Sequence, residues 1–193
     1  MRAWRWRLFS KNLRIALSIV TPPARVWSSD VVRPAFFVVV MHIEGSLDVG
    51  AVPYTERFGL AGAVAPGALD DARAAISADL VRLDGRPPPD ALVGMGGAVT
   101  NLTAVKLGLA TYDPDRVQGA DLDRAEIDRQ IERYRSRDAE ARRTIVGLQP
   151  KRADVILAGA CIVRTVMDKL GQQTLTVSDR GLRHGLLVDR FGA

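Results

Sequence analysis

The amino-acid sequence predicts an α/β domain with a parallel or mixed sheet. The first observation behind this prediction is that short apolar segments of strand length alternate with longer segments of helical periodicity over most of the chain. The second is a junction at which an apolar segment runs into a cluster of glycines and then into a helical segment. With 193 residues, of which 47% are hydrophobic and 25% charged, the chain can form one ordinary folded domain.

The first 40 residues differ from the rest in composition. They contain all three tryptophans. They also contain seven lysine and arginine residues but only one aspartate, which gives this segment a net charge of +6. Since the whole chain carries +5, the remainder carries −1. We therefore expect an irregular basic head over residues 1–40 and a folded domain over residues 41–193, with a β-type apolar run at 36–43 near the join. Because the folded part has no basic excess, nucleic acid is not an expected partner.

The first regular elements of the domain follow from periodicity. Residues 68–83 place apolar side chains three or four positions apart, which is one face of a helix. The turn-rich stretch 84–90 ends this helix. A short strand at 91–93 then leads into the glycines, and a helical segment over 99–109 follows them.

A small helical insertion is expected in the middle of the domain. After a turn at residues 112–115, two charged helices are predicted at 124–134 and 138–146. Asp123 and Glu126 have the spacing of a capping box, in which each side chain bonds a free amide at the start of the helix.

The last section of the sequence returns to alternating elements. It predicts a strand, a helix, a strand and a helix, at residues 154–157, 160–170, 174–177 and 180–188. The small residues 158–160 stand at the first of these junctions. The single cysteine, Cys161, lies in an apolar run, so we expect a buried thiol and a reducing, cytoplasmic environment. No stretch approaches the roughly 18 apolar residues that cross a membrane, and no membrane partner is expected.

The glycine-rich junction has the properties of a phosphate-binding loop. Gly94, Gly96 and Gly97 allow a tight turn and let an anion approach the main chain without a Cβ in the way. The free amides and the dipole at the start of the following helix attract negative charge, and the Thr100 hydroxyl lies within the same turn. A purely structural interpretation, in which the glycines serve only a tight turn and close helix packing, stays open at this point.

Five segments in order resemble the second half of the exopolyphosphatase and guanosine pentaphosphate phosphohydrolase (Ppx/GppA) family. They are residues 48–58, 94–100, 112–114, 157–160 and 178–183. The resemblance covers about residues 46–191 and implies one lobe of an actin-like, ribonuclease H-like fold, with a mixed sheet and helices on its faces. It also implies hydrolysis of the terminal phosphate of inorganic polyphosphate or guanosine pentaphosphate. The family's usual requirements are Mg²⁺ or another divalent cation and a water activated by a glutamate. No metal-ligand motif is visible in this chain.

The resemblance carries over to individual residues. Gly94, Gly96, Gly97 and Thr100 match the family's phosphate loop, while Ala98 stands where a threonine is common.

Two further matches lie outside the loop. Glu56 matches the acidic residue of a Val-Gly-Ala-Val-x-x-Thr-Glu stretch and is a candidate catalytic residue, or else a surface acid that pairs with Arg57 or a helix end. Arg183 matches an arginine near the end of the family's sequence and is a possible cleft residue. His184, which replaces a common glutamate, is expected to face solvent.

The family's first lobe and its Asp-x-Gly-Gly-Gly-Ser loop have no counterpart in this sequence, where only Glu44, Gly45 and Ser46 stand at the corresponding place. We therefore expect a truncated or frame-shifted product that is inactive alone. Two alternatives remain. The chain could be a non-catalytic phosphate-binding module, or a lobe whose other half comes from a homodimer or another partner chain.

Overall fold

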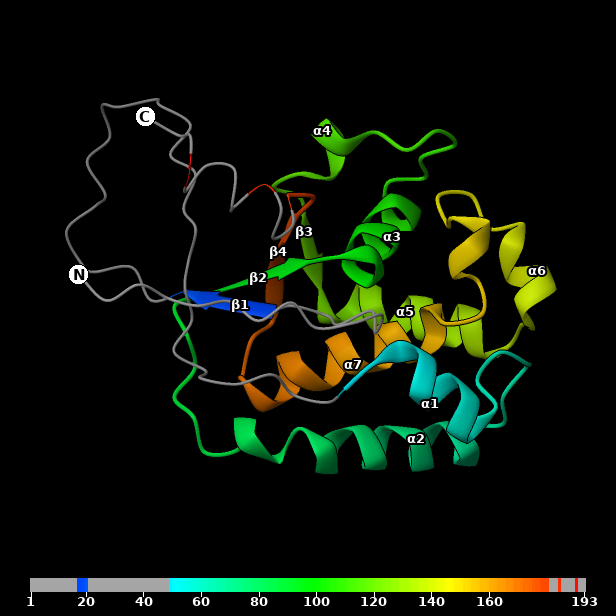
Figure 1. Ribbon diagram of the computed structural model, residues 1–193, viewed down its shortest axis with the longest axis horizontal. Helices are drawn as coiled ribbons and strands as arrows, with labels where there is room; N and C mark the ends of the chain where they lie inside the picture. The colour runs from blue at the N-terminus through cyan, green and yellow to red at the C-terminus, as the bar shows by residue number, and fades with distance from the viewer. Residues whose placement is uncertain (1–16, 21–48, 181–183, 185–189, 191–193) are drawn as a thin grey trace.

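The computed structural model describes residues 17–20, 49–180, 184 and 190. The described strands form one mixed sheet in the order β1-β2-β4-β3 (Figure 1). The strands are β1 Leu17–Val20, β2 Ala91–Met95, β3 Asp121–Asp123 and β4 Thr174–Ser178. The two central strands, β2 and β4, run parallel, while β1 and β3 pair antiparallel at the two edges. The predicted α/β class and mixed sheet are confirmed. Strand β1 lies in the segment that we expected to be irregular.

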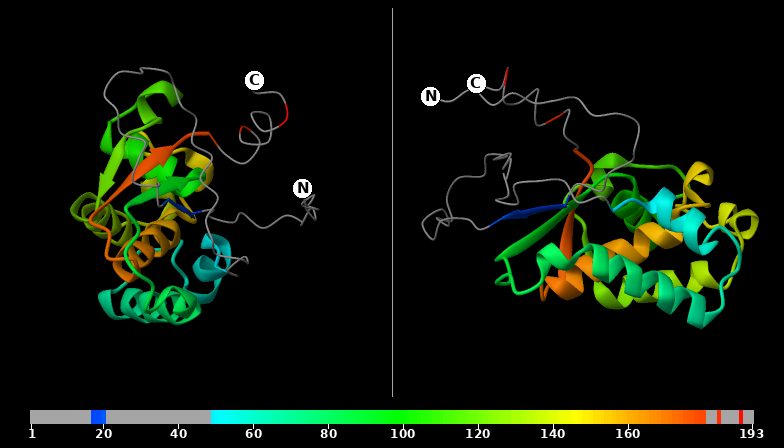
Figure 2. Two further views of the ribbon diagram at one scale, coloured as in Figure 1. Left: turned by 90° about the vertical axis from the view of Figure 1, so that its left-hand side faces the viewer. Right: turned by 60° about the horizontal axis from the view of Figure 1, so that its bottom comes forward.

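Helices cover the sheet and extend beyond it. They are α1 Ala51–Phe58, α2 Pro66–Asp79, α3 Gly97–Lys106, α4 Pro114–Val117, α5 Arg124–Arg135, α6 Ala139–Arg143 and α7 Ile156–Lys169, with 3₁₀ turns η1 Val81–Leu83 and η2 Pro150–Arg152. Helix α7 packs against α1, α2, α3 and α5. In Figures 1 and 2 it lies between the sheet and α2. Because it is enclosed in this way, α7 is apolar almost all round, as expected of a central helix.

One predicted strand is wrong. Residues 154–157 do not form a strand, since α7 begins at Ile156. The apolar run that contains Cys161 is buried from every side, and periodicity alone does not separate such a helix from a buried strand. The small residues 158–160 therefore lie inside a helix and not at a strand-to-helix junction. A Cβ at Gly159 would lie 3.1 Å from the Cβ of Ala98, so this glycine allows α3 to approach α7 closely.

Other predicted boundaries shift by a few residues. The helix predicted at 138–146 is limited to α6, and the turn predicted at 112–115 leads into the short helix α4. Strand β3 was not predicted. The capping interaction is formed on one side, because the Asp123 carboxylate accepts a hydrogen bond from the Glu126 amide at 2.8 Å. The predicted apolar run at 36–43 lies outside the described residues. Of the helix predicted at 180–188, the structure describes residues 180 and 184, and residue 184 is helical.

A buried arginine side chain connects the helical insertion to the rest of the domain. Arg142 in α6 is fully buried, and its guanidinium donates hydrogen bonds to four backbone carbonyl oxygens. Burial lowers the pKa of this group, since desolvation disfavours its charged form. No helix in the described part of the chain is both long enough and apolar enough to span a membrane.

Candidate anion-binding site

The glycine loop joins the central strand β2 to helix α3. Gly96 has φ 95° and ψ 173°, a backbone conformation that residues with a side chain rarely adopt. Helix α3 begins at the next residue without a side-chain cap. Within the described part of the chain, the backbone amides of Gly97, Ala98 and Val99 donate to no acceptor, and the amide of Thr100 bonds the Gly96 carbonyl at 3.1 Å. The first turn of α3 therefore presents free donors, as a site for an anion requires.

The starts of three helices meet beside this loop. A small hollow of about 10 Å³ is lined by Ala51, Gly97, Ala98, Arg152, Val155, Ile156 and Gly159. These residues include the first positions of α1, α3 and α7, and none of these three helices has a side-chain cap. Because each helix start carries a partial positive charge, their convergence adds to the attraction for an anion.

A guanidinium that the sequence did not single out lies over the loop. A Cβ at Gly97 would lie 3.0 Å from Nη2, 3.1 Å from Cζ and 3.2 Å from Nε of Arg152. The half-buried Arg152 side chain makes no hydrogen bond or ion pair with any other described residue. A cation beside a helix start is unfavourable by itself, since both are positive. An anion between them would be attracted by both.

Polar contacts join the loop to the backbone that precedes η2. The buried Asn101 of α3 donates to the Gly97 carbonyl at 2.8 Å and accepts from the Gln149 amide at 2.8 Å. Gln149 directly precedes η2, which carries Arg152. Asn101 was not predicted as a site residue, because its partner lies 48 positions away in the sequence.

The predicted loop residues differ in what they can offer an anion. Gly94 is buried within β2, and a Cβ there would lie 3.0 Å from both Leu175 and Val99, so the structure gives it a packing role. Thr100 is 8% exposed, and its hydroxyl donates to the Gly96 carbonyl at 3.2 Å. Gly96 and Gly97 therefore stand at the open part of the loop. Phosphate binding by these residues stays a prediction.

An aspartate follows the strand that is paired with β2. In the β2–β4 pairing, Met95 lies opposite Ser178, so Asp179 follows β4 as Gly96 follows β2. The Tyr112 hydroxyl donates to the Asp179 carboxylate. Burial and this hydrogen bond raise the pKa of Tyr112, so the phenol remains a donor at neutral pH.

No contact among the described residues brings the other predicted site residues to the loop. Glu56 is exposed on α1 and pairs with no other described residue. The alternative pairing with Arg57 is not formed among the described residues, and the Arg57 guanidinium lies 5.0 Å from the centre of the Phe58 ring. Arg183 lies outside the described residues, and His184 is exposed. A catalytic role for Glu56 and a cleft position for Arg183 stay predictions.

The described residues do not supply a site for the divalent cation that the resemblance implies. Within the described ranges, no three or more histidine, cysteine, aspartate or glutamate side chains gather in a way that could hold a metal ion. The Asp179 carboxylate accepts a hydrogen bond from Tyr112. This part of the chain therefore does not fit the role of metal ligand by itself.

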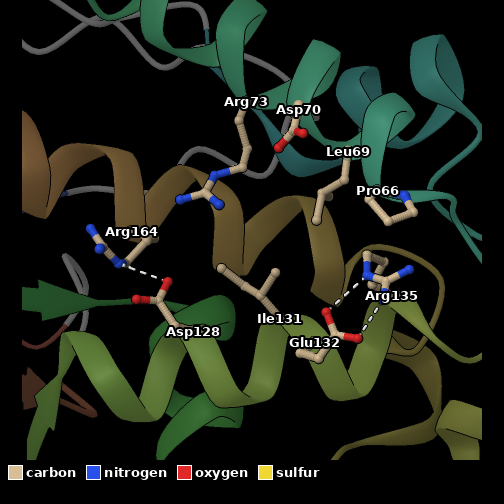
Figure 3. A pocket seen from close by; sticks show the side chains of 9 residues that line it. All are labelled: Pro66, Leu69, Asp70, Arg73, Asp128, Ile131, Glu132, Arg135 and Arg164. Atoms are coloured by element: carbon tan, nitrogen blue, oxygen red, sulfur yellow. Dashed lines mark hydrogen bonds and ion pairs between the residues drawn. The ribbon is translucent and has the colours of Figure 1, made fainter.

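A larger cavity of about 360 Å³ lies elsewhere, between α2, α5 and α7 (Figure 3). It is lined by Pro66, Leu69, Asp70, Arg73, Asp128, Ile131, Glu132, Arg135 and Arg164. Its charged side chains largely neutralise one another, because Arg164 pairs with Asp128 at 2.9 Å and Arg135 pairs with Glu132. The cavity therefore gives less reason to expect an anion than the glycine loop does.

Comparison with known proteins gives a consistent result. The family model described as "Ppx/GppA phosphatase family" matches residues 40–192. Exopolyphosphatase 2 of Mycobacterium tuberculosis is 31% identical over 109 residues, which are 52% of this chain and 33% of that protein. The bifunctional 3-dehydroquinate synthase/phosphatase of Fusobacterium nucleatum is 26% identical over 98 residues, 51% of this chain and 14% of that protein.

Solved structures match over a longer part of the chain. The Ppx/GppA phosphatase of Aquifex aeolicus superposes with a TM-score of 0.72 and 30% sequence identity, over 76% of this chain and 49% of its own length. An exopolyphosphatase from Cytophaga hutchinsonii superposes with a TM-score of 0.65 at 18% identity, which supports the fold alone. The predicted actin-like fold is thus confirmed, and the chain spans about half the length of these structures.

Proposed function

The chain belongs to the Ppx/GppA phosphatase family, and on this premise we propose that residues 49–180 form the lobe that grips the terminal phosphates of inorganic polyphosphate. The observation that carries the proposal is the position of the Arg152 guanidinium over Gly97, at the uncapped start of α3. Free amides and a guanidinium with no partner among the described residues are the donors that phosphate oxygens accept from most strongly.

The energetics favour an anion with several charges. A negative group at one helix start gains about 0.3–1 kcal/mol, and up to about 2 kcal/mol in a partly buried position. Charge-assisted hydrogen bonds from a guanidinium are roughly twice as strong as neutral ones. A polyphosphate end places several charged oxygens within reach of both kinds of donor, whereas a singly charged ion can use fewer of them.

Hydrolysis would require more than this lobe offers. Water attacks the terminal phosphorus and gives up a proton to a base, and the bond between that phosphorus and the bridging oxygen breaks. The shortened polyphosphate leaves with the electron pair on the former bridging oxygen, and the terminal group is released as orthophosphate. The described residues can bind and neutralise phosphate oxygens, but they provide one wall of a cleft. Holding the attacking water in line and keeping bulk water out can be worth many kcal/mol. We propose that the complementary lobe supplies the base and the cation contacts, and that this chain alone hydrolyses negligible amounts of polyphosphate.

Calorimetric titration with a short inorganic polyphosphate tests the binding proposal. The wild-type chain should bind, and both Arg152→Gln and Gly97→Ala should weaken binding by about tenfold or more, since each removes or displaces the guanidinium. Arg143→Gln is the matched control, because Arg143 is an exposed arginine in ion pairs with Glu140 and Asp154. Binding that is absent, or that neither loop substitution weakens, would contradict the proposal.

Two further measurements separate the alternatives. Phosphate release by the purified chain should not exceed the blank, and release that disappears when Gly96 and Gly97 are made bulky would show an active enzyme. Guanosine pentaphosphate should compete no better than polyphosphate of similar charge, because the donors at the loop recognise phosphate oxygens and not a base. Much stronger competition by the nucleotide would favour guanosine pentaphosphate as the substrate. The cytoplasmic location stays a prediction.

A further inference from the structure

Asp179 poses an electrostatic problem for an anion site. It directly follows β4, and the pairing of Met95 with Ser178 places it next to Gly96 across the sheet edge. Neighbouring strands are about 4.8 Å apart, so the backbone of Asp179 leaves the sheet beside the loop whose amides we propose bind phosphate. Like charges at this range repel, and the repulsion is stronger where water is partly excluded. A free Asp179 would therefore weaken the binding of polyphosphate.

The structure holds this carboxylate through a segment that comes from elsewhere in the sequence. The Tyr112 hydroxyl donates to Asp179 across 67 positions in the chain. The Asp179 amide donates to the Gln118 side chain at 2.9 Å, so the backbone is fixed as well. Further along, the Gly119 amide donates to the Val177 carbonyl at 2.8 Å. Segment 112–120 is thus bonded to the end of β4 at several points.

The phenol also lies next to the glycine loop. Thr100 is a hydrogen-bonding neighbour of Tyr112 that opposes the rise of its pKa. The same Thr100 hydroxyl donates to the Gly96 carbonyl at 3.2 Å. The Tyr112 hydroxyl therefore interacts with the Asp179 carboxylate and with a side chain that bonds the loop.

We propose that Tyr112 is a positioning residue that holds the Asp179 carboxylate away from the anion site, and so allows the glycine loop to bind polyphosphate. This inference rests on the proposed function. The Tyr112 hydroxyl would increase the affinity for polyphosphate only because it restrains the Asp179 carboxylate. When that charge is absent, the hydroxyl should no longer matter for affinity.

The chain provides a matched control for this claim. Tyr54 on α1 donates to Asp79 at the end of α2, and burial also raises the pKa of Tyr54. The two tyrosines thus make the same kind of bond to an aspartate. In Figure 1, α2 lies on the far side of α7 from α3. Tyr54→Phe removes the same hydrogen bond as Tyr112→Phe without uncovering a charge beside the loop.

Calorimetric titration of the full chain with a short inorganic polyphosphate tests the proposal. Tyr112→Phe should raise the Kd on the order of tenfold, since it frees one carboxylate next to the anion. Asp179→Asn should bind at least as tightly as the wild type. The double variant Tyr112→Phe/Asp179→Asn should recover the affinity of Asp179→Asn. Tyr54→Phe should lower the Tm to a similar extent as Tyr112→Phe and leave the Kd unchanged.

The outcomes separate this inference from the proposed function. Polyphosphate binding that weakens on Arg152→Gln but not on Tyr112→Phe would overturn the inference and leave the proposed function standing. A double variant as weak as Tyr112→Phe would also overturn it, because the hydroxyl would then act by some route other than the carboxylate. A wild-type chain that does not bind overturns both. If Tyr112→Phe does not fold, Asp179→Asn decides alone, and weaker binding by that variant would contradict the inference.

Discussion

Replacement of the buried Arg142 by methionine should destabilise the domain strongly. The guanidinium donates to the carbonyl oxygens of Leu60 at 2.7 Å, Tyr134 at 2.8 Å and Gly62 at 2.8 Å, with a longer bond to Ala153 at 3.3 Å. These carbonyls belong to the loop after α1, the end of α5 and the segment before α7. One side chain therefore joins three parts of the domain that are distant in sequence.

The expected loss follows from the acceptors that the substitution leaves behind. Methionine fills much of the aliphatic space, but the carbonyl oxygens lose the guanidinium donors. The Tyr134 carbonyl keeps a hydrogen bond from the Arg137 amide at 3.1 Å. A buried acceptor without a partner costs about 1–3 kcal/mol. Removal of the charge recovers part of the desolvation cost of the guanidinium, so the net loss should be about 3 kcal/mol and less than the sum over the acceptors. Since domains of this kind are stable by about 5–15 kcal/mol, this is a large fraction of the total.

Urea unfolding followed by circular dichroism measures this loss. With an m-value of about 1–3 kcal/mol/M, the midpoint should fall by about 1–3 M. Arg143→Met is the control. The Arg143 side chain is 43% exposed and its ion pairs lie at the surface, where they contribute about 0–1 kcal/mol. Equal midpoints for Arg142→Met and Arg143→Met would refute the view that the carbonyl contacts stabilise the domain.

Three further predictions concern the loop and the core. Gly96→Ala should lower the free energy of unfolding by about 1–2 kcal/mol in the same urea experiment, because φ 95° is strained for a residue with a Cβ although the space around it is open. Gly97→Ala should change the Tm little, since its Cβ meets only the movable end of Arg152, so a large drop in Tm would show that the contact is rigid. Burial raises the pKa of the Cys161 thiol to about 12. The thiol should therefore react with Ellman's reagent at mildly alkaline pH only after unfolding. Fast labelling of the folded chain would contradict the burial of this side chain.

The sequence predicted those features that are encoded in consecutive residues. The loop between β2 and α3 is an example, because a short strand, three glycines and the first turn of a helix lie within residues 91–100. The helices α2, α3 and α5 were likewise predicted from the local spacing of apolar residues. The sequence predicted a parallel or a mixed sheet. The sheet is mixed, since the edge strand β3 pairs antiparallel with β4.

The features that were missed depend on contacts between distant segments. Arg152 looks like an ordinary solvated charge in its own neighbourhood, and only the packing of η2 beside α3 places it over Gly97. Tyr112 and Asp179 both lie in segments that resemble the family, but their hydrogen bond follows from the topology of the sheet. The start of α7 was assigned to a strand because an apolar run enclosed on all sides has no polar face to reveal its period.

The glycine in the middle of the central helix has a consequence for how the loop can change. A side chain on Gly159 would press on Ala98, 3.1 Å from its Cβ position, and would also approach Ala51 at 4.0 Å. Any larger residue there would therefore separate the first turns of α1 and α3 without touching a bound molecule. The packing under the loop thus sets the spacing of the amide donors, so substitutions at this one position would change affinity by changing the distances between donors without removing any donor group.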